Sequence, residues 1–446
     1  MTVHTNRDVE PAGGAVAAMR VPPTGRAPKF LQGLGYAFLR RRTISYMTDR
    51  HGSAFTLRVP VFGNMVVVTD PALAKQVFTA STDDLGNIQP NLSRLFGPGS
   101  VFALEGAEHR RRRKILTPPF HGKAMKNYEA IVEEEVLRES QGWPDGEEFE
   151  TLEPMMRLTL NIILRAIFGA GGVQLEALRR ILPPWVTLGS KLAVLPTPTS
   201  DLGSWTPWGR LDSYRRQYNA VVGELIEQAR LDPAFDQRTD VLALLLRSTY
   251  EDGSPMSRSE IADELLTLLA AGHETTASTL AWSFERISRH PAVLAELVAE
   301  AAGDGNEYRQ AVILEVQRNR TVIDFAGRRV LAPVFELGQW RIPQGYSVSV
   351  AIGQVHGHAA DFPDPERFDP SRFLGARPNT FAWVPYGGGT RRCVGAAFAN
   401  MEMDVVLRTV LRRFVIETTT APAEKWHSRG VAFTPKRGGR VRMRRI

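Results

Sequence analysis

Tyr386-Gly-Gly-Gly-Thr-Arg-Arg-Cys393-Val-Gly395 is the stretch of this 446-residue chain that decides its fold. It places the only cysteine on a glycine-rich loop, directly before a predicted final helix that begins near Gly395. Glycines such as Gly387 allow positive φ angles and let a backbone approach a bulky planar partner. Amide groups at a helix N-terminus favour the thiolate, the form of cysteine that binds metals. We therefore interpret Cys393 as a candidate metal ligand and Arg391 as a candidate partner for an anionic cofactor group, whereas a lone cysteine without this loop is more simply a small buried apolar residue.

The longest predicted helix runs from about Arg258 to Arg289 and carries a second motif near its middle. Ala271-Gly-His-Glu-Thr-Thr276 combines an acid and two threonines with a glycine, which costs about 1 kcal/mol relative to alanine inside a helix. Threonine hydroxyls can bond to the carbonyl four residues earlier and bend the helix. Beside the cysteine loop the motif predicts a local opening with a function, although by itself it is more typical of an ordinary polar patch on a helix.

Two further pairs of residues have helical spacing. Glu315 and Arg318 are three residues apart, and His109 and Arg113 are four apart. Each pair therefore lies on one face of a helix, where its side chains can act together. Such pairs occur on many exposed helices and alone identify no function.

Taken together, these motifs resemble those of the cytochrome P-450 family, and the resemblance covers nearly the whole chain. The heme-binding loop of that family reads F-x-x-G-x-R-x-C-x-G, and this chain matches each fixed position except the first, where Tyr386 replaces Phe. The segment from Ala271 to Thr276 matches the family pattern A/G-G-x-D/E-T-T. The resemblance implies a mainly α fold of the α+β type, a helix-rich triangular prism with a small β-rich region. Heme would lie between the long central helix and the C-terminal helix.

The resemblance also implies roles for particular residues. Cys393 would be the axial ligand of the iron of heme b, and Glu274 and Thr275 would relay protons to dioxygen. A Glu–Arg–Arg cluster would lock the segment that precedes the cysteine loop. The implied heme-binding residues are His109, Arg113, Arg328, Arg391, Tyr386, Gly387, Gly395, Ala271 and Gly272, and the implied cluster is Glu315, Arg318 and Arg367. Residues 321–323 depart from the family because they lack its usual prolines, so the shape of the substrate site stays open.

The implied function is that of a heme-thiolate monooxygenase, which inserts one atom of dioxygen into a lipophilic substrate by hydroxylation or epoxidation. Electrons would come from NAD(P)H through a separate ferredoxin reductase and ferredoxin, because the sequence contains neither a flavin nor an iron–sulfur domain. Three rivals remain: a peroxide-driven member of the same family, a basic nucleic-acid-binding protein without heme, and a cysteine hydrolase that uses Cys393. The Glu274–Thr275 pair argues against the first, and bound heme would exclude the other two.

The composition indicates where the protein works. A single cysteine excludes an intrachain disulfide and favours the reducing cytosol. No stretch reaches the roughly 18 apolar residues of a membrane span, so we expect a cytoplasmic monomer without integral membrane association. The net charge of +7 comes partly from clusters at Arg110–Lys114, Arg40–Arg42 and Arg440–Arg445. These clusters lack zinc-finger spacing and RNA-binding aromatics, so we expect no nucleic acid. The choice between an acidic electron donor and a solvated surface stays open.

Along the chain we expect residues 1–20 to be disordered and residues 21–446 to form a single domain. Predicted helices cover Phe30–Asp49, a segment that begins at Asp70-Pro71, and Leu152–Phe168. Residues 183–207 are rich in Pro, Gly, Ser and Thr and are predicted to be a long irregular connection. Predicted strands are Ala54–Val59, Asn64–Thr69, Arg329–Leu337 and Tyr346–Ile352.

Overall fold

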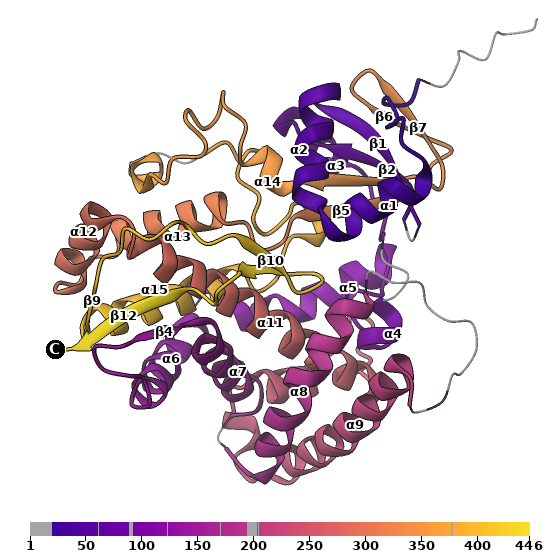
Figure 1. Cartoon of the computed structure of the whole chain (residues 1–446). Coiled ribbons are helices and arrows are strands. Elements are labelled where there is room, and N and C mark those ends of the chain that lie inside the picture. Colours follow the sequence, from indigo (N-terminus) through magenta and orange to yellow (C-terminus); the bar gives the residue numbers. More distant parts are fainter. Residues whose placement is uncertain are drawn as a thin grey trace, which may run out of the picture.

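The computed structural model describes residues 20–60, 62–88, 92–122, 124–169, 171–193, 203, 205–375 and 378–446. Within these residues the fold is mainly helical, with small sheets around the helical body (Figure 1). The expected mainly α fold with a small β-rich region is therefore confirmed. Residues 1–19, most of the segment predicted to be disordered, lie outside the described residues.

A five-stranded sheet forms the β-rich region near the N-terminus, with the strand order β1-β2-β8-β5-β3. Strands β2 and β8 run parallel, and the other pairs are antiparallel. Alternate residues of β2 face opposite sides: Val66 and Val68 pack toward helix α3, and Met65 and Val67 pack toward helices α1 and α2. The elements of this region are α1 Lys29–Phe38, α2 Arg40–His51, β1 Ala54–Val59, β2 Gly63–Val68, α3 Pro71–Thr79, β3 Leu85–Gly86, β5 Phe325–Val330, β6 Val334–Leu337, β7 Trp340–Pro343 and β8 Ser347–Ala351.

The single helix predicted over Phe30–Asp49 is two helices, because Leu39 has φ −127° and ψ 30° and interrupts the helix. Helix α2 then packs closely on α1, since a Cβ on Gly35 would lie 2.9 Å from the hydroxyl of Thr43. The predicted start of α3 is confirmed: the Asp70 carboxylate accepts hydrogen bonds from the first free amides of that helix.

The helical body is built around α11, which is buried over almost its whole length and packs along α7. Its predicted start is confirmed, because Ser257 and Glu260 form a reciprocal capping box. The helices of this part are α4 Leu92–Phe96, α5 Gly106–Leu116, α6 Ala124–Ser140, α7 Leu152–Phe168, α8 Val173–Leu192, α9 Pro207–Leu231, α10 Val241–Arg247, α11 Arg258–Ile287, α12 Pro291–Ala301, α13 Glu307–Asn319, α14 Ile352–Val355 and α15 Ala396–Leu411.

Helix α8 corrects the prediction of an irregular segment from residue 183. The helix continues through Pro183 and Pro184 as far as Leu192. Prolines disfavour helix interiors, but α8 buries an apolar face that includes Trp185, and this tertiary packing outweighs the local preference. Residues 194–202 and 204 of the predicted connection lie outside the described residues.

The C-terminal part adds two small sheets beside the helical body (Figure 1). One has the order β4-β12-β9 and joins residues far apart in sequence, and the other is the hairpin β10–β11. The hairpin packs on α11, where the Trp282 indole donates to the Phe433 carbonyl at 3.3 Å. The strands are β4 Glu148–Glu150, β9 Phe414–Ile416, β10 Trp426–Ser428, β11 Phe433–Pro435 and β12 Arg440–Arg445.

Candidate functional site

The cysteine loop is a tight turn that ends at α15. The Cys393 amide donates to the Tyr386 carbonyl at 3.0 Å, and Gly387 and Gly389 have φ angles of 65° and 66°. A Cβ on Gly388 would lie 2.6 Å from the ring of Phe78. The loop therefore needs its glycines both for backbone conformation and for close packing against α3.

The environment of Cys393 contains opposing influences on its charge. Burial raises the pKa of the thiol, whereas a hydrogen bond from the Gly395 amide and the nearby charges of Arg113 and Arg392 lower this pKa. Protein surrounds the sulfur, yet the residue keeps accessible surface. The residue therefore borders an internal space, and the Gly395 amide, at the start of α15, approaches the sulfur.

Four predicted cofactor-binding side chains converge near this loop from three segments. His109 and Arg113 come from α5, Arg328 from β5 and Arg391 from the loop itself. Burial, together with the charges of Arg391, Arg113 and Arg328, lowers the pKa of His109 to about 3, so the imidazole is uncharged at neutral pH. Burial and the charge of Arg391 lower the pKa of Arg328 to about 10. The structure thus brings together three guanidinium groups of like charge and one neutral imidazole.

No carboxylate among the described residues forms an ion pair with any of these four side chains. Arg391 donates to the Leu104 carbonyl at 2.7 Å, and Arg328 donates to the Gly388 carbonyl at 2.9 Å. Neutral carbonyls hold the two guanidinium groups in place, and the charge of Glu105 acts on Arg391 only from beyond ion-pair distance, so the positive charge of the group is only partly compensated. The cluster therefore fits a ligand with anionic groups, as the carboxylates of heme are.

A short segment links the cation cluster to α11. Ser100 and Thr267 share a hydrogen bond of 2.7 Å between their hydroxyls, and Leu104 in the same segment contacts Arg391. On α11 itself, Ala271, Gly272 and Thr275 keep partial accessibility in a stretch that is otherwise buried. Their spacing puts them on one face of the helix, so this face also borders an internal space.

The predicted local opening of α11 does not occur, because the helix is continuous from Arg258 to Ile287. The Thr275 hydroxyl donates to the Ala271 carbonyl at 2.9 Å without breaking the helix. Gly272 has a packing role, since a Cβ there would lie 3.2 Å from Ile163 of α7. The glycine therefore permits close contact of two helices.

Glu274 forms an ion pair with Arg429 at 3.0 Å. Burial raises the pKa of Glu274, and Arg429 lowers it. Arg429 lies after β10 and also contacts the Thr187 hydroxyl of α8 at 3.5 Å. No hydrogen bond joins Glu274 to the Thr275 side chain within the described part of the chain. No local sequence pattern pointed to Arg429, although an acid in a buried stretch of helix indicates that a cation must lie nearby.

The predicted Glu–Arg–Arg cluster is correct in two of its members. Arg318 binds Glu315 through two hydrogen bonds of 2.7 and 2.8 Å, and both side chains are buried. The Arg367 side chain is 71% exposed, and only its carbonyl accepts a bond from Arg318, at 3.2 Å. Arg372 lies nearer, with its Nε 3.8 Å from Glu315 and its side chain largely buried.

Arg367 is therefore replaced by Arg372 as the third side chain of the cluster. The sequence contains the pattern P-x-R-F twice, at residues 365–368 and 370–373. The second copy forms a short 3-10 turn that packs against α13, which carries Glu315 and Arg318. The packing of this turn, and not the local pattern, decides which arginine joins the acid.

Comparison with known proteins identifies the family. The family model described as Cytochrome P450 matches residues 22–440. The chain belongs to the cytochrome P450 family. It is therefore a heme-dependent monooxygenase, an oxidoreductase whose cofactor contains heme iron.

Individual P450 proteins are similar to this chain over nearly its whole length. Cytochrome P450 138 of Mycobacterium tuberculosis is 64% identical, with 98% of this chain and 99% of that protein covered. Cytochrome P450 135B1 of the same organism is 40% identical, with 96% and 92% covered. A solved structure of cyanobacterial CYP120A1 with bound retinoic acid has a TM-score of 0.84 at 25% identity, with 96% of this chain and all of that chain covered.

The tyrosine that replaces the usual phenylalanine of the P450 loop has dedicated partners. The Tyr386 hydroxyl accepts from Gln317 at 2.7 Å and donates to Asn400 at 2.6 Å. Burial raises the pKa of Tyr386, so the hydroxyl stays protonated. Gln317 lies between Glu315 and Arg318, so one turn of α13 supports both the Glu–Arg cluster and the cysteine loop.

The basic run on α5 of this P450 is largely neutralised by neighbouring acids. Arg111 pairs with Asp252 at 2.7 Å, and Lys114 pairs with Glu251. Arg112 points inward and binds Glu264 of α11 at 2.8 Å. These paired residues of α5 therefore contribute little to a surface that would attract an acidic partner.

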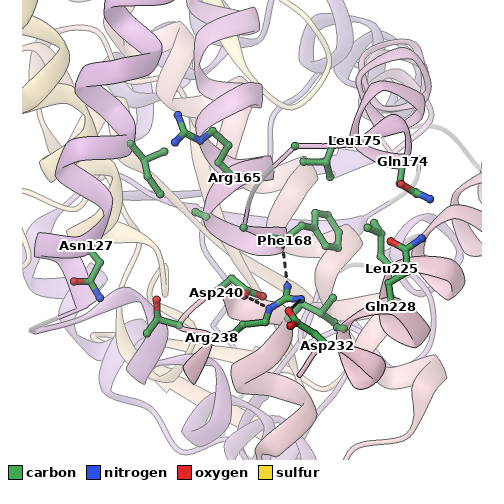
Figure 2. A pocket seen from close by; sticks show the side chains of 18 of the residues that line it. Asn127, Arg165, Phe168, Gln174, Leu175, Leu225, Gln228, Asp232, Arg238 and Asp240 are labelled. Carbon is green, nitrogen blue, oxygen red and sulfur yellow. Dashed lines mark hydrogen bonds and ion pairs between the residues drawn. The ribbon is translucent and has the colours of Figure 1, made fainter. Parts of the chain in front are cut away.

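A pocket of about 470 Å³ lies among α6, α7, α8, α9 and α10, away from the cysteine loop (Figure 2). Its Arg238 is bound to Asp240 at 2.8 Å and to the Phe168 carbonyl at 3.1 Å. Its Arg165 binds two glutamates of α6. The charges of this P450 pocket are compensated internally, so it lacks the uncompensated groups found at the cysteine loop.

Proposed function

We propose that Cys393 is the axial ligand of the iron of heme b. The observation that carries this proposal is the convergence of His109, Arg113, Arg328 and Arg391 beside the only cysteine. His109 and Arg328 are buried, Arg113 and Arg391 are half-buried, and none of the four forms an ion pair with a described acid. The three guanidinium groups would neutralise the two carboxylates of the cofactor, the His109 imidazole would offer a hydrogen bond to one of them, and the Gly395 amide would stabilise the thiolate. When bound, heme iron activates dioxygen so that one oxygen atom enters the substrate.

The residues of α11 then bind and orient the reactants. Ala271 and Gly272 border the cofactor, and the Thr275 hydroxyl holds a proton at the dioxygen site. Glu274 would supply the protons, and for this its carboxylate must first be released from Arg429. Water molecules are required between the two side chains, because they do not contact each other directly.

The proposed substrate is a lipophilic molecule that undergoes hydroxylation or epoxidation. The segments assigned to the substrate pocket are mostly apolar: Val101–Leu104, Leu268–Ala271 and Thr321–Phe325. The last of these is fixed by the hairpin, through a bond of 2.9 Å from the Phe433 amide to the Val322 carbonyl. The retinoic acid bound to CYP120A1 is an apolar carboxylic acid and supports this class of substrate.

The proposed electron route is NAD(P)H, ferredoxin reductase and ferredoxin, with the enzyme acting as a cytoplasmic monomer formed by a single domain over residues 21–446. No helix within the described residues combines the length and the apolar character needed to cross a membrane. A peroxide-driven reaction is the competing proposal. Product formation with hydrogen peroxide alone, at a rate equal to that with NAD(P)H and donors, would favour that alternative.

The ligand assignment predicts a distinctive spectrum. The reduced carbonyl complex of the purified protein should have the strongly red-shifted Soret band of thiolate-bound heme, because the sulfur donates charge to the iron. Cys393→His should keep heme and lose this band, while Tyr386→Phe, which keeps the sulfur, should retain it. The assignment fails if Cys393→Ala shows the same red-shifted band as the parent.

A further inference from the structure

Helix α1 presents its apolar side to solvent. Phe30 and Phe38 are 70% and 80% exposed, and Leu31 and Leu34 are exposed between them. These positions lie on one face of the helix. The opposite face, with Gln32, Gly33 and Tyr36, is buried against the β-rich region.

This arrangement reverses the usual pattern of a helix on the surface of a globular protein, in which apolar residues face the core. The buried Gln32 is satisfied there, since its amide donates to the Gly25 and Ala27 carbonyls at 2.9 and 2.6 Å. The buried face of α1 therefore needs no further hydrogen-bond partner for Gln32. When one face of a helix is already packed, a contiguous exposed apolar patch on its other face marks a surface that binds another molecule.

Basic residues flank the apolar face, and the same segment of sequence contains no acidic residue. From residue 20 to residue 48 the sequence contains Arg20, Arg26, Lys29, Arg40, Arg41 and Arg42 and no aspartate or glutamate. Arg41 is used internally in an ion pair with Asp324 at 2.7 Å. Arg26, Lys29 and Arg42 are exposed at the two ends of α1 and form no ion pair with another described residue.

We propose that the outer face of α1 docks on the surface of an anionic lipid membrane. A helix with an apolar face and flanking cations lies in the plane of such an interface, with aromatic and leucine side chains below the headgroups and cations beside the phosphates. Figure 1 shows α1 in the outer part of the molecule, beside the β-rich region. The charge pattern favours anionic lipid over a second copy of this chain, because two copies would bring like charges together.

The test uses the full-length, heme-loaded protein and vesicles. Co-sedimentation with vesicles of phosphatidylglycerol and phosphatidylcholine should exceed that with phosphatidylcholine alone and should decrease as salt rises. The double variant Phe30→Ser and Phe38→Ser should lower the partition coefficient at least about tenfold, because two aromatic anchors are lost. Val173→Ser with Leu231→Ser, which removes similarly exposed apolar side chains elsewhere, should bind like the parent.

The outcomes separate the possible occupants of the face. Equal binding of both double variants would overturn the proposal, because the lipid contact would then lie elsewhere. Absence of binding to anionic vesicles would also overturn it, and a concentration-dependent dimer lost only in the α1 variant would assign the face to a second copy. The carbonyl spectrum, recorded on each variant, reports the heme site independently, so failure here leaves the proposed function unaffected.

Discussion

At the scale of single residues, Arg367 and Arg372 have the same local sequence pattern and different surroundings. Arg372→Ala removes a largely buried guanidinium beside the buried Glu315 carboxylate, and we expect a loss of about 1–3 kcal/mol in unfolding free energy. Arg367→Ala removes an exposed side chain and should change this free energy by less than about 0.5 kcal/mol. Denaturant unfolding of both variants measures the difference. Equal losses of unfolding free energy in the two variants would mean that the Arg367 side chain also contributes to the Glu315–Arg318 cluster.

The Glu274–Arg429 pair provides a second prediction at this scale. Arg429→Gln leaves a buried carboxylate without its cation, so the variant should lose about 1–3 kcal/mol of unfolding free energy at neutral pH. Glu274→Gln together with Arg429→Gln should recover part of this loss, because no unpaired charge remains. A double-mutant cycle by thermal unfolding gives the coupling energy. A coupling near zero would mean that the two side chains are independent in solution.

The predicted site residues make contacts that are local in sequence. The site residues that were not predicted make contacts with distant segments. The cysteine loop, His109 with Arg113, and Glu315 with Arg318 are local patterns, and the structure brings each together as expected. Arg429 is far from Glu274 in sequence, and the partners of the Tyr386 hydroxyl lie on two other segments. Such contacts depend on tertiary packing, which no local spacing encodes.

At the scale of elements, α5 and α11 are joined by Arg112 and Glu264, and this pair predicts a pH effect. Burial raises the pKa of Glu264 from 4.5 to about 7. The folded state therefore binds a proton that the unfolded state releases between these values. Stability should fall as pH rises through this window, by about 3 kcal/mol in total, and then level off.

Thermal unfolding at pH 5 and pH 8 measures this effect. Glu264→Gln should be less sensitive to this pH change than the parent. Glu260→Gln is the matched control: the folded-state pKa of Glu260 is lowered, so its contribution is present at high pH and lost on acidification. An unchanged pH profile in Glu264→Gln would show that another group carries the dependence.

Element boundaries were predictable where local and tertiary preferences agree. The apolar run of α7 and the strand-forming residues of β1 match their predicted ranges. The break at Leu39 and the continuation of α8 through two prolines follow from packing against neighbouring helices. The family motifs alone were sufficient for the fold class, whereas these boundaries required the partners of each helix.

At the scale of the whole molecule, the net charge of +7 directs the choice of an electron donor. Arg392 is exposed beside Cys393 and forms no ion pair with a described residue, whereas Lys114 is paired with Glu251. Reduction by an acidic ferredoxin should slow as salt rises, and Arg392→Glu should slow it about tenfold at low salt. Lys114→Ala should have a smaller effect. Stopped-flow reduction rates that do not change with ionic strength would exclude electrostatic docking.

The repelling cations beside the cysteine have a consequence for the life of the protein in a cell. They come from α5, β5 and the cysteine loop, so three distant parts of the chain resist being brought together until an anion joins them. A ligand that binds only the native state stabilises it in proportion to the logarithm of its free concentration. A newly synthesised chain that has not bound heme should therefore unfold more often and be degraded sooner. The amount of this enzyme should then follow the supply of heme even when its rate of synthesis is constant.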